Sequence, residues 1–178
     1  NSLYNGGFDL NDLRELSELA WKGLLDTKFE HHPVHTFYEG STEINSFVLG
    51  IKGIGGFYAI DTGDGLVMLD AGSQLDIETG YQEIKKWRPN DYLKKVIFSH
   101  HHVDHVFAVQ KFDEECKDKN VPLPKVYSHA LTPKHFDRYI QTQGWNTAIN
   151  RRQFAIDSEK FSWPSSYRYP DEIYENEC

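Results

Sequence analysis

The sequence contains few cysteines, no long apolar run and no run of basic residues. No stretch approaches the roughly 18 consecutive apolar residues of a membrane-spanning helix, so we expect no membrane span. Its two cysteines, Cys116 and Cys178, are too few for a disulfide framework and lack the spacing of a zinc finger. Acidic residues outnumber basic ones by 27 to 19. This balance argues against nucleic acid as a partner, because phosphate binding needs clustered lysine and arginine.

The composition is that of an ordinary globular protein. Of the 178 residues, 39% are apolar, 14% aromatic and 26% charged, which excludes the disordered and collagen-like classes. At roughly 150 residues per domain, the length predicts one domain with a single core and room for an appendage.

The first part of the chain predicts a helix followed by a connector. In residues 9–26, leucines recur at three- and four-residue spacing behind Asp9 or Asn11, which is typical of a capped amphipathic helix. Three histidines then surround Pro33 within residues 31–35, and because they lack a ligand spacing we assign them to the connector. Residues 1–44 are therefore interpreted as an N-terminal helix and connector.

Glycine-punctuated apolar runs between residues 45 and 71 predict two or three antiparallel strands. The dipeptide Asp64-Gly65 separates two of these runs and favours a tight hairpin turn with positive φ at both positions. The rest of the pattern alternates, with helical spacing at 74–87, a strand at 93–99, a helix from 106, a strand at 125–129 and a helix from 133. Such alternation predicts an α/β or α+β layered domain, which we place at residues 45–156, before an irregular aromatic tail at 157–178.

The chemical signal of the sequence is the pattern H-x-H-x-D-H, formed by His100, His102, Asp104 and His105 directly after the strand at 93–99. Alternate residues of an extended segment project to the same side, so His100 and His102 can bind one cation as a pair. Imidazole nitrogen and carboxylate oxygen are the ligands expected for zinc and similar divalent metals. We therefore predict a metal site; the alternative is a solvated loop or a set of helix-capping histidines.

The same residues resemble the metallo-β-lactamase superfamily of metal-dependent hydrolases. The resemblance rests on FSHHHVDH and on the strand LVMLDAG, which ends at Asp70-Ala71-Gly72. Residues Gly144 to Phe154, GWNTAINRRQF, are similar to a segment of alkylsulfatase-like members. The resemblance implies an αββα sandwich of two similar halves, with only the first half in this chain. We accordingly expect an N-terminal fragment that lacks the metal ligands of the second half.

For activity, the resemblance implies a hydrolase in which metal-activated water attacks a small-molecule ester. It implies two zinc or other divalent ions in the intact protein, one on His100 and His102 and one on His105 with Asp104. Asp104 would be the catalytic residue beside the water. The alkylsulfatase-like branch implies an alkyl sulfate ester as substrate. Alternatives are a thioester or lactone hydrolase of the same superfamily, or a non-catalytic truncated remnant that acts as a metal-binding or interaction module.

Further residues have expected roles around this site. A sulfate ester needs a cationic partner, for which Arg151 or Arg152 is suited. Because adjacent helical residues point about 100° apart, at most one of them faces the cleft, and a surface role is the alternative. Asp70 resembles a position that supports the metal loop by hydrogen bonding rather than by ligation. We expect His101 to point away from its neighbours, and His129 to be an ordinary hydrogen-bonded histidine at a strand end.

The half-sandwich interpretation also predicts a contact surface. One face of the strands at 45–71 should pack under the helices of this chain, and the other face should stay exposed. Because large exposed apolar patches mark interaction surfaces, we expect the chain to self-associate through this face.

Overall fold

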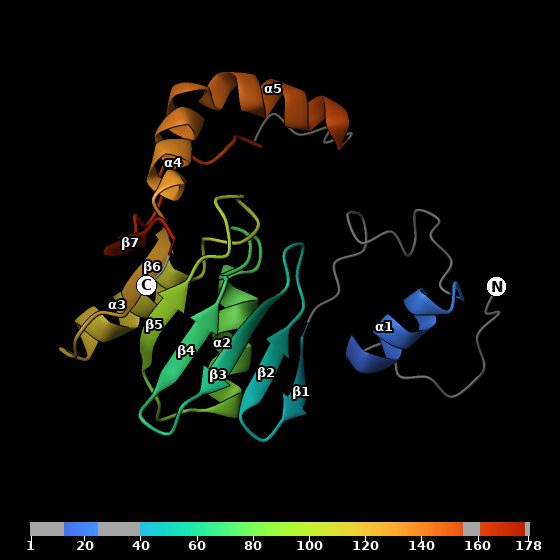
Figure 1. The fold of residues 1–178 in the computed structure, drawn as a ribbon, viewed down its shortest axis with the longest axis vertical. Coiled ribbons are helices and arrows are strands. Elements are labelled where there is room, and N and C mark those ends of the chain that lie inside the picture. Colours follow the sequence, from blue (N-terminus) through green and yellow to red (C-terminus); the bar gives the residue numbers. More distant parts are fainter. Residues whose placement is uncertain (1–12, 25–39, 155–160, 177–178) are drawn as a thin grey trace.

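The computed structural model describes residues 13–24, 40–154 and 161–176 (Figure 1). These residues form one seven-stranded sheet whose strand order, β1 to β7, follows the chain. The strands are β1 (Ser41–Asn45), β2 (Val48–Ile51), β3 (Phe57–Asp61), β4 (Leu66–Leu69), β5 (Leu93–Ile97), β6 (Lys125–His129) and β7 (Glu172–Tyr174). The helices are α1 (Leu13–Trp21), α2 (Ile77–Trp87), α3 (Val109–Asp118), α4 (Leu131–Gln141) and α5 (Gln143–Gln153).

The helix α1 lies within the segment 9–26 that the leucine spacing predicts as helical. Its Leu19 side chain is only 2% exposed, as expected for the apolar face of an amphipathic helix. The helix ends earlier than predicted, because residues 22–23 form a turn after Trp21. The other parts of that prediction, and the histidines at 31–35, lie outside the described residues.

The sheet is mixed, with an antiparallel half and a parallel half. Strands β1 to β4 pair antiparallel, and β2, β3 and β4 are the three antiparallel strands that the glycine-punctuated runs predict. Strands β4, β5, β6 and β7 pair parallel. Parallel neighbours need a crossover connection, and α2, α3 and the pair α4–α5 lie in the three connections. The alternation of strands and helices in the sequence therefore becomes one α/β layered domain.

The turn between β3 and β4 differs from its prediction. The connection has four residues, 62–65, rather than two, and the positive φ angles are at Gly63 (78°) and Gly65 (124°) rather than at Asp64 and Gly65. Thr62 closes this turn, since its backbone N–H and its hydroxyl both donate to the Gly65 carbonyl, at 3.1 and 2.8 Å. The hairpin prediction is confirmed, but the predicted turn geometry is wrong.

Two strands lie in segments for which the sequence predicts none. Strand β1 begins at Ser41, inside the predicted connector, and β7 lies inside the predicted irregular tail. Both are edge strands that acquire their conformation by pairing, β1 with β2 and β7 with β6. An ion pair of 3.0 Å between Lys125 and Glu172 links β7 to its neighbour. The division of the chain into 1–44, 45–156 and 157–178 otherwise stays a prediction.

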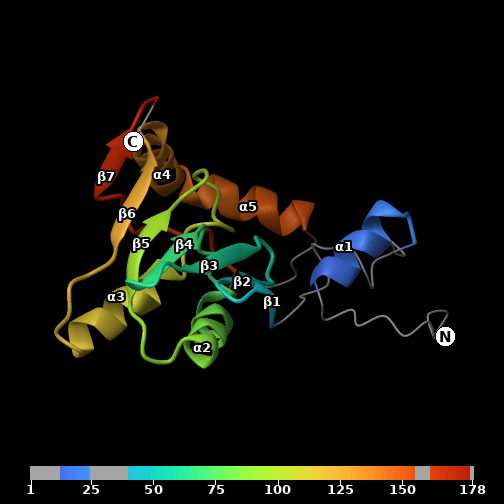
Figure 2. The same cartoon turned by 60° about the horizontal axis from the view of Figure 1, so that its bottom comes forward.

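Helices α2 and α3 cover one face of the sheet (Figure 2). On β3 this face carries Phe57 and Ala59, which are fully buried in the main core cluster. The opposite face alternates with it: Tyr58 on β3, Leu69 on β4 and Ile97 on β5 are each exposed by roughly two fifths, at 43%, 39% and 38%. The central strands thus bury one face and leave apolar side chains on the other partly exposed.

The parallel strands β4, β5 and β6 end at the same edge of the sheet (Figure 1). The carboxyl ends of parallel strands are where α/β proteins place their sites. In the three described stretches of the chain, no helix combines the length and the apolar character that crossing a bilayer requires.

Candidate metal centre

The four residues of the H-x-H-x-D-H pattern lie together in the loop between β5 and α3. The ring centroid of His100 is 4.5 Å from that of His102 and 4.4 Å from that of His105. Asp104 also contacts His105, with 3.3 Å between Oδ2 and Nε2. The loop therefore gathers three imidazoles and one carboxylate at the carboxyl end of β5.

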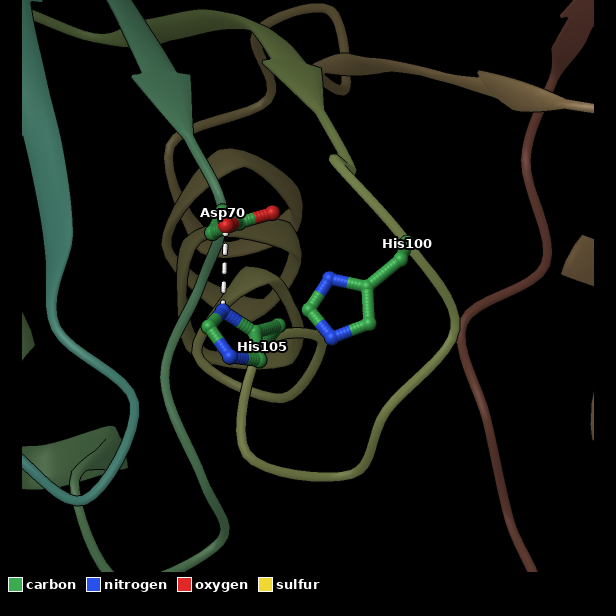
Figure 3. Close-up of side chains that lie close together, drawn as sticks. All are labelled: Asp70, His100 and His105. Atoms are coloured by element: carbon green, nitrogen blue, oxygen red, sulfur yellow. Dashed lines mark hydrogen bonds and ion pairs between the residues drawn. The ribbon is translucent and has the colours of Figure 1, made fainter.

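Asp70, at the end of β4, is the anchor of this loop (Figure 3). Its Oδ1 accepts the Ser99 backbone N–H at 2.7 Å, and its Oδ2 accepts the Ser99 hydroxyl at 2.7 Å and Nδ1 of His105 at 3.0 Å. Burial raises the pKa of Asp70, but the hydrogen bonds from His105 and Ser99 outweigh it and hold the pKa below its ordinary value. Asp70 is therefore an ionised, almost fully buried carboxylate that connects two strand ends.

The backbone at Asp70 has a left-handed conformation, with φ of 59°. Such a conformation is uncommon outside glycine but is tolerated by Asp and Asn. It turns the chain so that Ala71 and Gly72 run along the loop: the Ala71 N–H donates to the His105 carbonyl at 2.7 Å, and the Gly72 carbonyl accepts the Phe107 N–H at 3.1 Å. This turn aligns the end of β4 with the histidine loop.

His105 lies between two carboxylates. Its Nδ1 donates to Asp70 at 3.0 Å and its Nε2 lies 3.3 Å from Asp104. The hydrogen bonds to Asp104 and Asp70 raise the pKa of His105 to about 9, and the same contact lowers the pKa of Asp104. A divalent cation bound at Nε2 would take the place of the proton that this nitrogen directs at Asp104, while Nδ1 kept its hydrogen bond to Asp70.

His101 faces a different neighbour from the other histidines. Its ring stacks on His135 of α4, with centroids 3.8 Å apart and an interplanar angle of 17°, and lies 5.7 Å from the ring of Tyr139. Burial, followed by the nearby His135, lowers the pKa of His101 to about 4. This ring thus packs the histidine loop against α4.

The donor atoms fit a divalent metal ion by their chemistry and spacing. Within the described part of the chain, Asp70, His100 and His105 each offer one ligand atom, and these atoms lie within 4.8 Å of one another. Imidazole nitrogen and carboxylate oxygen are ordinary zinc ligands. From the sequence we expect Asp70 only to support the metal loop by hydrogen bonding. Its position at the end of a strand, together with Ser99 directly before the motif, is the sequence signal for its place beside the histidines.

The other site candidates contact groups outside this cluster. Arg151 donates from Nε and a terminal nitrogen to the Phe161 carbonyl, at 3.1 and 2.7 Å. Arg152 is exposed on the same last turn of α5, beside a shallow hollow that it lines with Ile149 and Gln153. His129 accepts the Leu131 N–H at Nδ1, 3.2 Å away, and its Nε2 lies 3.2 Å from a backbone carbonyl. The roles of Arg151 and Arg152 toward a substrate stay predictions.

Comparison with known proteins gives a family match and similar solved structures. Residues 53–172 match the family model described as the metallo-beta-lactamase superfamily. A search of curated proteins gives no match. Among solved structures, the sec-alkylsulfatase Pisa1 from Pseudomonas sp. is 22% identical with a TM-score of 0.50, and the match covers 67% of this chain and 19% of that chain.

Two lactamases are also similar to the chain. The subclass B3 metallo-β-lactamase BJP-1 of Bradyrhizobium japonicum is 13% identical with a TM-score of 0.49, covering 78% of this chain and 47% of that one. The metallo-β-lactamase FEZ-1 of Legionella gormanii is 15% identical with a TM-score of 0.49, covering 76% and 46%. The chain thus spans about a fifth of the alkylsulfatase and just under half of each lactamase.

Proposed function

The chain belongs to the metallo-β-lactamase superfamily and has its fold, and from this premise we propose that the histidine loop forms part of a metal-dependent ester hydrolase site. In this proposal His100 and His102 hold one divalent ion, and His105 with Asp104 holds a second. Zinc is the proposed metal, because the donor set is imidazole and carboxylate. When bound, such ions supply an activated water near neutral pH and polarise the scissile bond.

One observation carries the proposal: His105 is oriented by a carboxylate. Its Nδ1 donates to the buried Asp70, so its Nε2 is directed at Asp104 and the space beside His100. Histidines that bind metals commonly donate their second ring N–H to a carboxylate, which fixes the ring and raises its basicity. A solvated loop or a helix cap has no need of a buried carboxylate behind the ring.

Asp104 is the proposed catalytic residue. Its carboxylate is half-buried beside His105, and the hydrogen bond from His105 holds its pKa below the ordinary value, so it is ionised at neutral pH. An ionised carboxylate in this position orients the attacking water and accepts its proton at Oδ.

The substrate proposed for the intact protein is an alkyl sulfate ester. Support comes from the similarity of Gly144–Phe154 to alkylsulfatase-like members, and an alkylsulfatase is among the structures that share the fold. Arg152, exposed beside the hollow on α5, or Arg151 would receive the sulfate oxygens. Thioester and lactone hydrolysis are the alternatives within the superfamily.

The test combines metal binding with hydrolysis. The purified chain, loaded with zinc and dialysed, should retain metal, and His102→Ala should retain less. The matched control is His129→Ala, a strand-end histidine outside the cluster, which should leave metal content unchanged. Release of sulfate from a short alkyl sulfate, of thiol from a thioester or of acid from a lactone should vanish in Asp104→Asn. Equal metal content in His102→Ala and His129→Ala would overturn the proposal.

A second candidate function, an interaction module, is favoured by the uncovered sheet face. Tyr58, Leu69 and Ile97 expose apolar area on neighbouring strands, and such contiguous area supports association. Sedimentation of the chain should show self-association that Ile97→Lys abolishes. The control Leu131→Lys changes an exposed leucine on α4 and should leave association intact. A compact monomer at all concentrations would contradict this candidate.

A further inference from the structure

We propose that Ser99 is a positioning residue, which relays the charge of Asp70 to His100 and so determines which ring nitrogen of His100 carries the proton. The inference rests on the proposed metal-binding function of the loop and extends it to a residue that neither the motif nor the family comparison assigns. Ser99 lies between the two groups: its Oγ is 2.7 Å from Asp70 Oδ2 and 2.9 Å from Nδ1 of His100.

Counting protons assigns the direction of both hydrogen bonds. The Ser99 hydroxyl has a single proton, and an ionised carboxylate can only accept. The short contact between Ser99 and Asp70 therefore uses the hydroxyl proton. The Ser99 oxygen is left as the acceptor for His100, so Nδ1 of the neutral His100 ring must carry a proton. The chain of donors runs from His100 through Ser99 to Asp70.

The consequence is that Nε2 of His100 keeps its lone pair. The nitrogen that binds a metal is determined by the hydrogen bond that the other ring nitrogen makes. Asp70 thus acts on two histidines through one oxygen, on His105 directly at 3.0 Å and on His100 through Ser99. The ring centroids of the two histidines lie 4.4 Å apart, and one ligand atom of each ring lies within 4.8 Å of one of the other.

Ser99 is held rigidly enough to serve as this relay. Its backbone N–H donates to Asp70 Oδ1 while its hydroxyl donates to Oδ2, so one residue is bound to both oxygens of one carboxylate. Asp70 is 7% exposed. A buried acceptor without its donors would be costly, which disfavours other rotamers of the Ser99 side chain.

The experiment measures the tautomer in the metal-free protein by long-range ¹H–¹⁵N correlation spectroscopy with ¹⁵N-labelled histidine at neutral pH. We expect His100 to be protonated at Nδ1 in the native chain. Ser99→Ala removes the acceptor, so we expect the proton to move toward Nε2 and zinc affinity, measured by competition with a chromophoric chelator, to fall on the order of 10- to 100-fold. Ser99→Thr keeps the hydroxyl and should restore both.

The readouts separate the relay from the metal site itself. His129 serves as the internal reference, since its signals should not change in Ser99→Ala if the fold is intact. Protonation of His100 at Nε2 in the native chain, or an unchanged tautomer in Ser99→Ala, would overturn the relay. Absence of zinc binding by the native chain would overturn the proposed function, whereas the tautomer of the metal-free protein still decides the role of Ser99.

Discussion

Gly55, in the connection between β2 and β3, lies against the backbone of the histidine loop, and an alanine there should displace Asp104. A Cβ atom at residue 55 would stand 2.0 Å from the Asp104 carbonyl oxygen and 2.7 Å from its carbonyl carbon, while real Cβ contacts essentially never fall below 3.0 Å. The obstacle is backbone rather than a flexible side chain. The two segments must therefore separate by at least about 1 Å, well beyond the roughly 0.2 Å tolerance of a metal–ligand distance.

This displacement predicts two measurable losses for Gly55→Ala. Overpacking of a well-packed contact costs about 1–3 kcal/mol, so the free energy of unfolding in urea should fall by that amount. Because Asp104 and His105 move with the loop, zinc affinity should fall on the order of 10- to 100-fold, and hydrolysis by about 100-fold for a 1 Å misplacement.

The neighbouring glycine supplies the control. A Cβ atom at Gly56 would meet its nearest neighbour, the Ile51 carbonyl oxygen, at 3.5 Å, which is an ordinary contact. Gly56→Ala should therefore keep native zinc affinity and stability within about 1 kcal/mol. If Gly55→Ala bound zinc and unfolded like Gly56→Ala, the close approach between Gly55 and Asp104 would not exist in solution, and the reasoning would be refuted.

Three further predictions follow from the core and the site. Asp70→Asn keeps a residue that tolerates positive φ but loses the ionised acceptor, so the free energy of unfolding in urea should fall by about 1–3 kcal/mol and zinc should bind more weakly. Native stability of this variant would contradict the anchoring role of Asp70. Phe57→Ala removes a fully buried ring and should lower the free energy of unfolding by about 3–5 kcal/mol, measured in thermal or urea unfolding. Tyr58→Ala, on the exposed face, should lower it by less than about 1 kcal/mol. Elemental analysis after dialysis should find fewer than two zinc ions per chain, because four motif ligands are too few for two ions; two retained ions would mean that other residues ligate.

The central part of the fold could be predicted from local patterns. The apolar runs between 45 and 71 and the strand that precedes the histidines are short, apolar and bounded by glycine or polar residues, so periodicity identifies them. Local sequence patterns do not identify the edge strands. Strand β7 has three residues, two of them exposed, and exists because it pairs with β6, which lies more than 40 residues earlier. Pairing over that separation leaves no local signal.

The residues of the site could be predicted from the sequence, but the hydrogen bonds that connect them could not. The spacing of His100, His102, Asp104 and His105 puts them in one loop, and the structure places them side by side. What the spacing cannot show is the bond between Asp70 and Ser99, 29 residues apart, since it depends on β4 and β5 being parallel neighbours and on the left-handed backbone at Asp70. In the relay proposed above, the tautomer of His100 depends on the contact between Ser99 and Asp70.

The agreement between strand order and chain order has a consequence for synthesis on the ribosome. Each strand from β2 to β7 pairs with the strand made immediately before it. The growing chain therefore never has to open a formed sheet to insert a later strand, and each new strand adds to an edge that is already present. The antiparallel half, joined by short turns, can form first because its contacts are local. The histidine loop follows it out of the ribosome and meets an Asp70 that is already in place.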